Sequence, residues 1–503
     1  MQHIITYPIL FQAFVAVLLL FFWQKVKIQR WVSIIGSAIA VIISFSLFFH
    51  VWENGIISIQ MGNWAAPFGI TLIADSLAVT MVVLASIVGF AVSLFSTRGI
   101  VASRIKFGYY PILHFMIMGL SGAFLTGDIF NLYVWFEVII ISSFVLLTIG
   151  GKKAQVEGAV KYFTLNMLAS VVFLTAIALL YGTTGTLNMA ELAQIIPLVE
   201  NQGLIEIIAI IFLIAFGVKS GVFPLFTWLP AAYHTPPAAV SSLFGGLLTK
   251  LGVYAMLRVF TLLFSMSAFN FDWIIFIAVL TIISGAMGAL VQKDLIKMFS
   301  YLIICHIGFM LSGLGMGSEI AITGAVFYMI HDIIVKSNLF LVGGILHRIT
   351  GSTRIANMGG IMKDYPMLTL LFLIPLFSLV GVPPFSGFWP KISLISASLL
   401  TENYWVLGSI IFGSVITLVV VAKIILEVFA KNLPKRPALK SFKYFTNFSN
   451  LEKRVLIYPI VFLALISLVI GFGAEPIQQL SEKVAFELTH PEVYIETVFP
   501  KSK

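Results

Sequence analysis

The chain has 503 residues, of which 60% are hydrophobic and 10% are charged, whereas soluble domains average about 45–50% apolar and about 25% charged residues. These proportions exclude a water-soluble globular protein, a disordered chain and a nucleic-acid-binding protein. The net charge is +9, but in a membrane protein the position of the charges is more informative than their sum. The only cysteine, Cys305, allows no intrachain disulfide and no cysteine-ligated metal or iron–sulfur site by itself.

Fourteen apolar runs follow one another along the chain, which predicts an all-α polytopic membrane protein with about 14 transmembrane helices. We expect the first run to be a span and not a cleaved signal, because its basic residues follow the apolar stretch. The run 367–400 is too long for one straight span and is interpreted as a broken helix. The runs are 4–23, 31–52, 72–96, 109–127, 129–149, 160–181, 206–226, 236–262, 271–291, 295–316, 320–346, 367–400, 405–430 and 455–473.

Basic residues gather in alternate loops, which hold 21 of the 30 Lys and Arg residues. By the positive-inside rule these loops face the cytoplasm, so both termini are predicted to be extracytoplasmic in a multi-pass cell-membrane protein. The opposite side is assigned most of the loop acids and only the basic residues Arg258, Lys483, Lys501 and Lys503. The basic loops carry Lys25, Lys27, Arg30, Arg98, Arg104, Lys106, Lys152, Lys153, Lys161, Lys293, Lys297, Arg348, Arg354, Lys363, Lys431, Lys435, Arg436, Lys440, Lys443, Lys453 and Arg454.

Eight charged residues fall inside the predicted spans. A lysine at the centre of a span costs about 2.5–3.5 kcal/mol on insertion scales, so such residues usually face a bundle interior and mark an ion path. Four of the lysines lie near the predicted bilayer midplane, as does Glu137, whereas Lys423 lies near the cytoplasmic end and is predicted to form a structural pair with Glu427. The eight are Glu137, Lys219, Lys250, Asp332, Lys336, Lys391, Lys423 and Glu427.

A buried lysine suits proton transfer because burial disfavours its charged form and a nearby carboxylate favours it. A lysine whose carboxylate partner approaches and withdraws is therefore a switchable proton carrier. Glu137 and Lys219 are the candidate pair, and the alternative is a fixed ion pair between packed helices.

The segment around Lys336 allows two interpretations. Asp332 lies four residues earlier, so a local Asp332–Lys336 ion pair is geometrically easy. In the other interpretation, a π-bulge brings His331 to the same side as Lys336 and the group relays protons. His234 and His306 are further relay candidates, with a satisfied core histidine as the alternative for each.

The seventh and twelfth spans both combine a Gly or Pro break, an aromatic-Pro turn and a lysine. Interrupted segments at corresponding positions indicate a transporter built from repeats, and a spacing of five helices inverts the second unit. We therefore expect one integral membrane domain over 1–503, with a first five-helix repeat at 109–262, a second at 271–430, and flanking helices in 1–108 and 431–503. A simple proline kink is the alternative. The breaks are assigned to Pro224, Pro230, Pro383 and Pro384.

Asp128 is predicted to cap the helix that follows it, and Asp75, near the outer edge of the third span, is predicted to be structural. Phosphate-binding loops, zinc motifs and nucleophile elbows are not found in the sequence, so neither a cofactor nor a metal site is predicted.

Taken together, these residues resemble the antiporter-like subunits shared by Mrp-type cation/proton antiporters and the membrane arm of respiratory NADH–quinone oxidoreductase. The resemblance extends in order from about residue 60 to 430, and it is closest to the D-subunit group of the Mrp type. Segments 64–75, 127–132 and 233–237 carry the likeness to that group, and Lys391 stands where a respiratory homologue of similar length usually has Glu. The other matching segments are 136–137, the break at Lys219, 228–237, 248–254, 292–297, 331–336 and 381–391.

The resemblance implies a secondary-transporter subunit, not an enzyme, in a hetero-oligomeric membrane complex that exports Na⁺ in exchange for H⁺ and supports cytoplasmic pH homeostasis. It implies a lateral proton track through Glu137, Lys219, Lys250, His331, Lys336 and Lys391. The sequence departs from many relatives at Ala231, where they carry an acid, and His234 is the candidate substitute in proton uptake. Two alternatives remain open, a proton-pumping subunit of a quinone oxidoreductase and a non-conducting scaffold.

Overall fold

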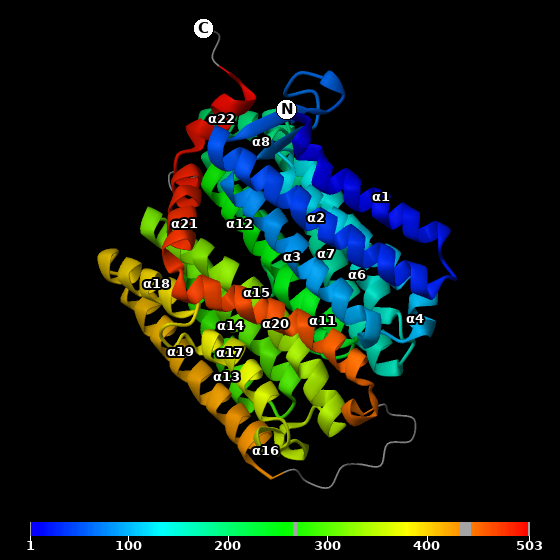
Figure 1. Ribbon diagram of the computed structural model, residues 1–503. Coiled ribbons are helices and arrows are strands. Elements are labelled where there is room, and N and C mark those ends of the chain that lie inside the picture. Colours follow the sequence, from blue (N-terminus) through cyan, green and yellow to red (C-terminus); the bar gives the residue numbers. More distant parts are fainter. Residues whose placement is uncertain (1, 265–268, 433–443, 501–503) are drawn as a thin grey trace.

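The computed structural model describes residues 2–264, 269–432 and 444–500, and most of these residues are helical (Figure 1). The N-terminal elements are η1 (Gln2–Thr6), α1 (Tyr7–Phe21), α2 (Val26–Asn54), β1 (Ile57–Gln60), η2 (Met61–Asn63), β2 (Thr71–Ala74), α3 (Ser76–Gly99), α4 (Ala102–Lys106), α5 (Tyr109–Leu125), α6 (Ile129–Thr148), α7 (Lys153–Thr184), α8 (Met189–Ile195), η3 (Ile196–Leu198), α9 (Gln202–Ser220), α10 (Trp228–Tyr233), α11 (Ala238–Leu243), η4 (Phe244–Leu248) and α12 (Thr249–Leu262). The remaining elements are α13 (Asp272–Val291), α14 (Leu295–Met316), α15 (Glu319–Thr350), η5 (Ile355–Asn357), α16 (Ile361–Asp364), α17 (Pro366–Val380), α18 (Phe388–Leu400), α19 (Tyr404–Ile424), η6 (Ile425–Ala430), η7 (Phe445–Asn447), α20 (Asn450–Phe472), α21 (Ala474–Thr489) and α22 (Pro491–Val498).

The membrane-spanning character predicted from the sequence is confirmed. Within the described residues, 12 helices are long and apolar enough to cross a membrane. The 17-residue α5 and the broken pair α17–α18 are shorter apolar helices, and they account for the remaining predicted runs. The protein is therefore an all-α multi-pass membrane protein, to which the structure adds one antiparallel β1–β2 hairpin that pairs Ile57 with Ala74.

Burial divides the spans into inner and outer helices. The most apolar windows of α15 and of the α11–α12 span are fully buried inside the protein, whereas only 33% of the α2 window is buried. An inner helix is surrounded by protein on every face, so it can hold polar side chains that lipid would not tolerate. Three of the central charges, Lys250, Asp332 and Lys336, lie on these inner helices.

Two spans are interrupted, as the sequence predicted. Helix α9 ends at Gly221 (φ 79°) and α17 ends at Gly381 (φ 82°), and in both the N–H of the αL glycine donates to the carbonyls three and four residues earlier. The loops that follow hold cis peptide bonds before Pro224 and Pro384. Pro230, predicted to lie in the first break, instead lies inside the short helix α10.

Corresponding backbone contacts occur in the two halves of the chain. The start of α6 bonds to the segment after α7, and the start of α14 bonds to the segment after α15. The first contact lies at the end of the molecule that carries α8 and α22, and the second at the end that carries α16 (Figure 1). We propose on this basis that units 109–262 and 271–430 are inverted repeats. The bonds are Ile129 N–H to Leu187 O (3.0 Å), Met189 N–H to Gly127 O (2.9 Å), Leu295 N–H to Thr353 O (2.9 Å) and Ile355 N–H to Lys293 O (3.0 Å).

The π-bulge predicted between His331 and Lys336 is wrong. Helix α15 is α-helical from Glu319 to Thr350. The π-helical turns among the described residues are η4, which ends two residues before Lys250, and η6. The local sequence carries no signal that distinguishes these positions, because a π-turn depends on the packing of the helix against its neighbours.

Arg258 is predicted from the sequence to lie in an outer loop, but the structure places it inside α12 with 3% of its surface exposed. Its guanidinium pairs with Asp75 at 2.5 Å and lies over the ring of Tyr494 in α22. Asp75 also accepts the Ala78 N–H at 2.8 Å, so its predicted structural role is confirmed as a helix cap and a buried ion pair. Asp128 caps α6 as predicted, accepting the Asn131 N–H at 2.7 Å.

The first turns of the chain and helix α22 lie at one end of the bundle, and α16 lies at the other (Figure 1). This arrangement agrees with the prediction that both termini lie on the same side of the membrane. Which end of the bundle faces the cytoplasm stays a prediction. Several of the loop charges used for that prediction lie outside the described residues, namely Lys435, Arg436, Lys440, Lys443, Lys501 and Lys503.

Candidate functional site

The predicted site residues lie in the interior of the described structure. The Lys250, His331 and Lys336 side chains are 0% exposed, and Lys219 and Lys391 are 4% and 6% exposed. Glu137, in α6, is partly buried. The four lysines and His331 must therefore find their partners within the protein or in enclosed water, whereas Glu137 is partly exposed at the surface of the bundle.

Lys219 lies in the last turn of α9, immediately before the first break. Its Nζ donates to Ser170 Oγ at 3.0 Å and lies 4.5 Å from the centre of the Phe136 ring. Glu137 follows Phe136 and acts electrostatically on Lys219, but the described structure holds no direct ion pair between the two. The Oε1 atom of Glu137 is buried without a hydrogen-bond partner among the described residues.

The Glu137–Lys219 geometry argues against the fixed ion pair that is the alternative interpretation. Glu137 acts electrostatically on Lys219, and no ion pair joins the two among the described residues. A carboxylate in this position favours the charged lysine more strongly as it approaches and less strongly as it withdraws.

Asp332 occupies the centre of the site. Its Oδ2 lies 2.6 Å from Lys250 Nζ, and its Oδ1 lies 2.9 Å from His306 Nδ1. Lys250 also donates to the Gly245 carbonyl at 2.9 Å, an acceptor in the π-helical turn η4. His306 is therefore held beside Asp332, an arrangement that both the relay interpretation and the satisfied core histidine allow, so its relay role stays a prediction.

The local Asp332–Lys336 ion pair is wrong. Asp332 pairs across helices with Lys250, and Lys336 Nζ is buried with no hydrogen-bond partner among the described residues. Positions four apart on a helix are near neighbours, but here the carboxylate is directed toward α12 and α14. Lys336 is left as a buried amine beside Asp332, whose charge acts on it electrostatically.

Lys391 and the partner of His331 lie at the second break, between α17 and α18. Lys391, in the first turn of α18, donates to the Val380 carbonyl at 2.6 Å and is 3.4 Å from the Leu379 carbonyl. Those acceptors are freed by the end of α17, and such freed groups are tolerated in a membrane only when protein or water satisfies them. His331 Nδ1 is 2.8 Å from Ser386 Oγ within the same break, and its Nε2 has no described partner.

Contacts link Lys250, Asp332 and His306 into one series that reaches toward Lys391. Lys250 pairs with Asp332, Asp332 contacts His306, and the His306 ring stacks on Phe309 at 5.5 Å. Lys391 Nζ lies 5.8 Å from the centre of that Phe309 ring. On the other side, α9 packs so closely on α12 at Gly252 that an added Cβ would clash with α9. The residues that the sequence singles out on separate spans are thus brought together.

His234 lies apart from this series, in the turn after α10. Its Nδ1 is 2.8 Å from the Pro230 carbonyl. Burial, with a smaller contribution from the Lys297 charge, lowers the pKa of His234. The ring lines a cavity of about 550 Å³ at the end of the bundle that carries the basic loops.

The predicted Lys423–Glu427 pair is wrong. Lys423 Nζ donates to the Leu290 carbonyl at 3.2 Å, and Glu427 pairs with Lys431 at 3.1 Å. Both members of the predicted pair are satisfied, but each by another partner.

Two partners of the site are not anticipated by the sequence. Ser170 and Ser386 hold Lys219 and His331, and a lone serine in a span gives no signal in the sequence. The sequence marks Asp332 as an intramembrane acid but pairs it with the wrong lysine. The available signal for Asp332 is that an acid stands inside an apolar run.

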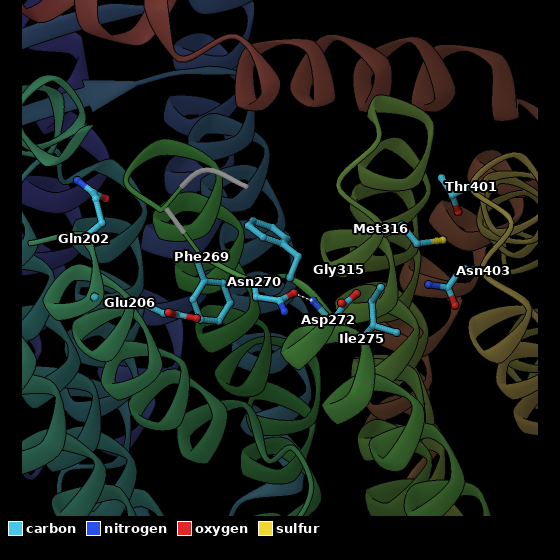
Figure 2. A pocket seen from close by; sticks show the side chains of 12 residues that line it. Gln202, Glu206, Phe269, Asn270, Asp272, Ile275, Gly315, Met316, Thr401 and Asn403 are labelled. Carbon is cyan, nitrogen blue, oxygen red and sulfur yellow. Dashed lines mark hydrogen bonds between the residues drawn. The ribbon is translucent and has the colours of Figure 1, made fainter. Parts of the chain in front are cut away.

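A second cavity, of about 640 Å³, opens at the opposite end of the bundle (Figure 2). Glu206 and Asp272 contribute carboxylates to its lining, and Asn270 and Asn403 contribute amides. None of the site lysines lines this cavity.

Comparison with known proteins gives consistent results. The family described as "NADH:quinone oxidoreductase/Mrp antiporter, TM" matches residues 126–417. The chain is 42% identical over 499 residues to the D subunit of the Na⁺/H⁺ antiporter of Alkalihalophilus pseudofirmus, and 38% identical over 502 residues to that of Bacillus subtilis, with 99% of each chain covered in both comparisons. A chain in the structure of the Mrp complex from Dietzia sp. is similar with a TM-score of 0.90 and 25% identity, covering 98% of this chain and 99% of the other. A chain of the membrane-bound sulfane sulfur reductase, an archaeal respiratory membrane complex, is similar with a TM-score of 0.85 and 27% identity, covering 99% of both.

Proposed function

We propose, on the premise that the chain belongs to the NADH:quinone oxidoreductase/Mrp antiporter transmembrane family, that it is the D-type component of a multisubunit monovalent cation/proton antiporter. In this function the protein conducts protons along its buried Lys, Glu and His side chains and helps to drive Na⁺ export in cytoplasmic pH homeostasis. The observation that carries the proposal is the contact series from Lys250 through Asp332 and His306 toward Lys391, in the interior of a bundle similar to Mrp subunits.

The geometry supports proton transfer by lysine deprotonation. Lys219, Lys336 and Lys391 are buried amines without a carboxylate in direct contact among the described residues. The neutral amine is the form that such surroundings favour, so little free energy is needed to release a proton from the ammonium. Movement of Glu137 toward Lys219, or of Asp332 from Lys250 toward Lys336, would favour reprotonation. Each carboxylate then acts as the element that switches a lysine between its two states.

Lys219→Ala tests the mechanism directly. Vesicles that contain the assembled complex and a pH gradient are expected to lose most Na⁺-dependent proton exchange, because the buried amine at the first break is gone. The matched control is Lys161→Ala, which removes an exposed lysine paired with Glu157 on α7 and leaves the interior intact. Exchange at the wild-type rate in Lys219→Ala, with complex assembly unchanged, would show that the protein is a scaffold.

A proton-pumping role in a quinone oxidoreductase is the second candidate, and the similarity to a chain of an archaeal respiratory complex favours it. Deletion of the coding sequence separates the two functions. An antiporter component predicts sodium sensitivity with normal respiration, whereas a respiratory component predicts copurification with a peripheral redox arm and impaired respiration.

A further inference from the structure

The cavity of about 550 Å³ beside His234 is lined by basic residues that have no part in the contact series from Lys250 toward Lys391. Basic side chains reach it from four separate segments, and none of its lining residues is Asp or Glu. These basic residues are Arg104 in α4, Lys152 before α7, His234 after α10, and His347 and Arg348 near the end of α15.

Arg104 is the most informative of them. It is partly buried, and no hydrogen bond, ion pair or ring contact joins its guanidinium to the described residues. Burial lowers the pKa of Arg104, and no nearby acid offsets this effect within the described structure. A guanidinium presents five N–H donors in a fixed fork that matches the oxygens of a phosphate. A guanidinium with these free donors at a cavity wall can bind an anion that comes from outside this chain.

The acids near the cavity are already engaged elsewhere. Glu157 pairs with Lys161 at 2.7 Å, and Glu452 pairs with Arg98 at 3.6 Å. Asp294 caps α14 through two backbone N–H groups and accepts a hydrogen bond from Thr353. These acids act electrostatically on Arg348, His234 and His347, whereas none of them acts on Arg104, so the uncompensated charge of the cavity lies at Arg104.

The cavity also has an apolar wall. Phe95, Ile296 and Phe340 line it together with Pro236 and Pro237. A basic pocket between transmembrane helices with an adjoining apolar wall suits a phosphate headgroup that carries acyl chains.

We propose that this cavity is a binding site for a phosphate-bearing anion, held by Arg104 and Lys152. The anion comes either from an anionic phospholipid headgroup or from free inorganic phosphate. The site is separate from the buried lysine series, and its binding does not require that the protein conduct protons.

The test uses the purified whole complex in vesicles of phosphatidylcholine, with phosphatidylglycerol as one probe and inorganic phosphate as the other. Binding is read as the increase in thermal unfolding temperature and, for lipid, as the phosphatidylglycerol retained on the complex in mass spectrometry. Replacing Arg104 and Lys152 together (R104Q/K152Q) is expected to weaken binding by about tenfold or more, since each contributes a charge-assisted contact.

The matched control is K106Q/K153Q, which removes the same charge from exposed neighbours that do not line the cavity. K152Q alone, at an exposed position, keeps the test valid if the double variant does not assemble, and R104K is expected to restore part of the binding. Stabilisation by phosphatidylglycerol alone identifies the lipid, and stabilisation by phosphate in pure phosphatidylcholine identifies the free anion.

Equal binding of both probes by wild type, R104Q/K152Q and the control would overturn the proposal. A carbodiimide cross-link between Lys152 and a carboxylate of another component of the complex would also overturn it, because the positive charge would then be neutralised by protein.

Discussion

Asp332 shows how one residue defines the electrostatics of the site. Its two carboxylate oxygens contact Lys250 at 2.6 Å and His306 at 2.9 Å, and all three side chains are fully buried. A buried pair gains little overall stability, because the cost of desolvating two charges offsets their attraction, but removal of one partner leaves an isolated buried charge. The pair therefore fixes the position of the proton carriers more than it stabilises the fold.

Asp332→Asn is expected to lower the free energy of unfolding by about 3–5 kcal/mol, because Lys250 loses its counterion in the interior. The double variant Lys250→Met with Asp332→Leu should regain most of that stability while it remains inactive in exchange. Denaturant titration of the purified protein in detergent measures the first effect and vesicle exchange the second. Replacing the exposed Lys161–Glu157 pair is the control and should change little. If Asp332→Asn is as stable as the wild type, Asp332 is not the buried counterion of Lys250.

Glu487, in α21 outside the candidate spans, gives a prediction of pH dependence. Burial, followed by the charge of Asp75, raises its pKa, while hydrogen bonds from the Ser76 N–H and hydroxyl oppose the rise. Because the folded state binds the proton more tightly than the unfolded chain, this group's contribution to stability is greatest below its unfolded pKa of about 4.3 and falls as pH rises through the folded pKa.

Glu487→Gln should therefore flatten this part of the stability profile, and the unfolding temperature should fall less between acidic and neutral pH than in the wild type. Thermal unfolding of the purified protein over that range measures the difference. Lys483 lies one turn earlier and acts on Glu487 with opposite sign, so Lys483→Gln should steepen the same decline. Identical profiles for all three proteins would contradict the prediction.

At the scale of elements, close helix contacts bring the lysine-bearing segments together. Gly252 lets α12 approach α9, where a Cβ would meet the Ser220 N atom at 2.9 Å and the Phe216 carbonyl at 3.1 Å. Because backbone atoms cannot rotate away as a side chain does, the two helices would have to separate. The approach places the end of α9, with Lys219, beside the α12 segment that starts near Lys250.

Gly252→Ala should therefore destabilise the protein by about 1–3 kcal/mol and reduce exchange, because overpacking displaces the helices that carry the amines. Vesicle exchange per assembled complex is the measurement. Gly182→Ala in α7 is the control, since a Cβ there meets no described atom within 4 Å. Equal exchange rates in the two variants would show that the α9–α12 spacing does not matter.

At the scale of the whole molecule, the alternation of basic loops predicts the orientation. The single cysteine is buried, so Cys305→Ser gives a background without reactive thiols. Introduced cysteines at the exposed positions Lys106 and Glu53 should then react with a membrane-impermeant maleimide from opposite sides, Lys106→Cys from the cytoplasm and Glu53→Cys from outside. Labelling of intact cells against lysed cells distinguishes the two. Both sites reacting from outside would contradict the topology.

The sequence by itself determined the spans, the positions of the two breaks and most of the buried charges, although it placed the buried Arg258 in an outer loop. Hydropathy and the Gly and Pro breaks are local properties, so α9 ends at Gly221 and α17 at Gly381 much as expected, and a lysine in an apolar run is visible without any knowledge of its neighbours. The tertiary structure alone decided the pairing. Asp332 contacts Lys250 and His306 on other helices instead of Lys336 on its own, and the π-helical turn lies before Lys250 and not within α15. The Asp332 pairing and the position of the π-helical turn depend on which helix faces pack together. The residue pattern of a single helix does not contain that information.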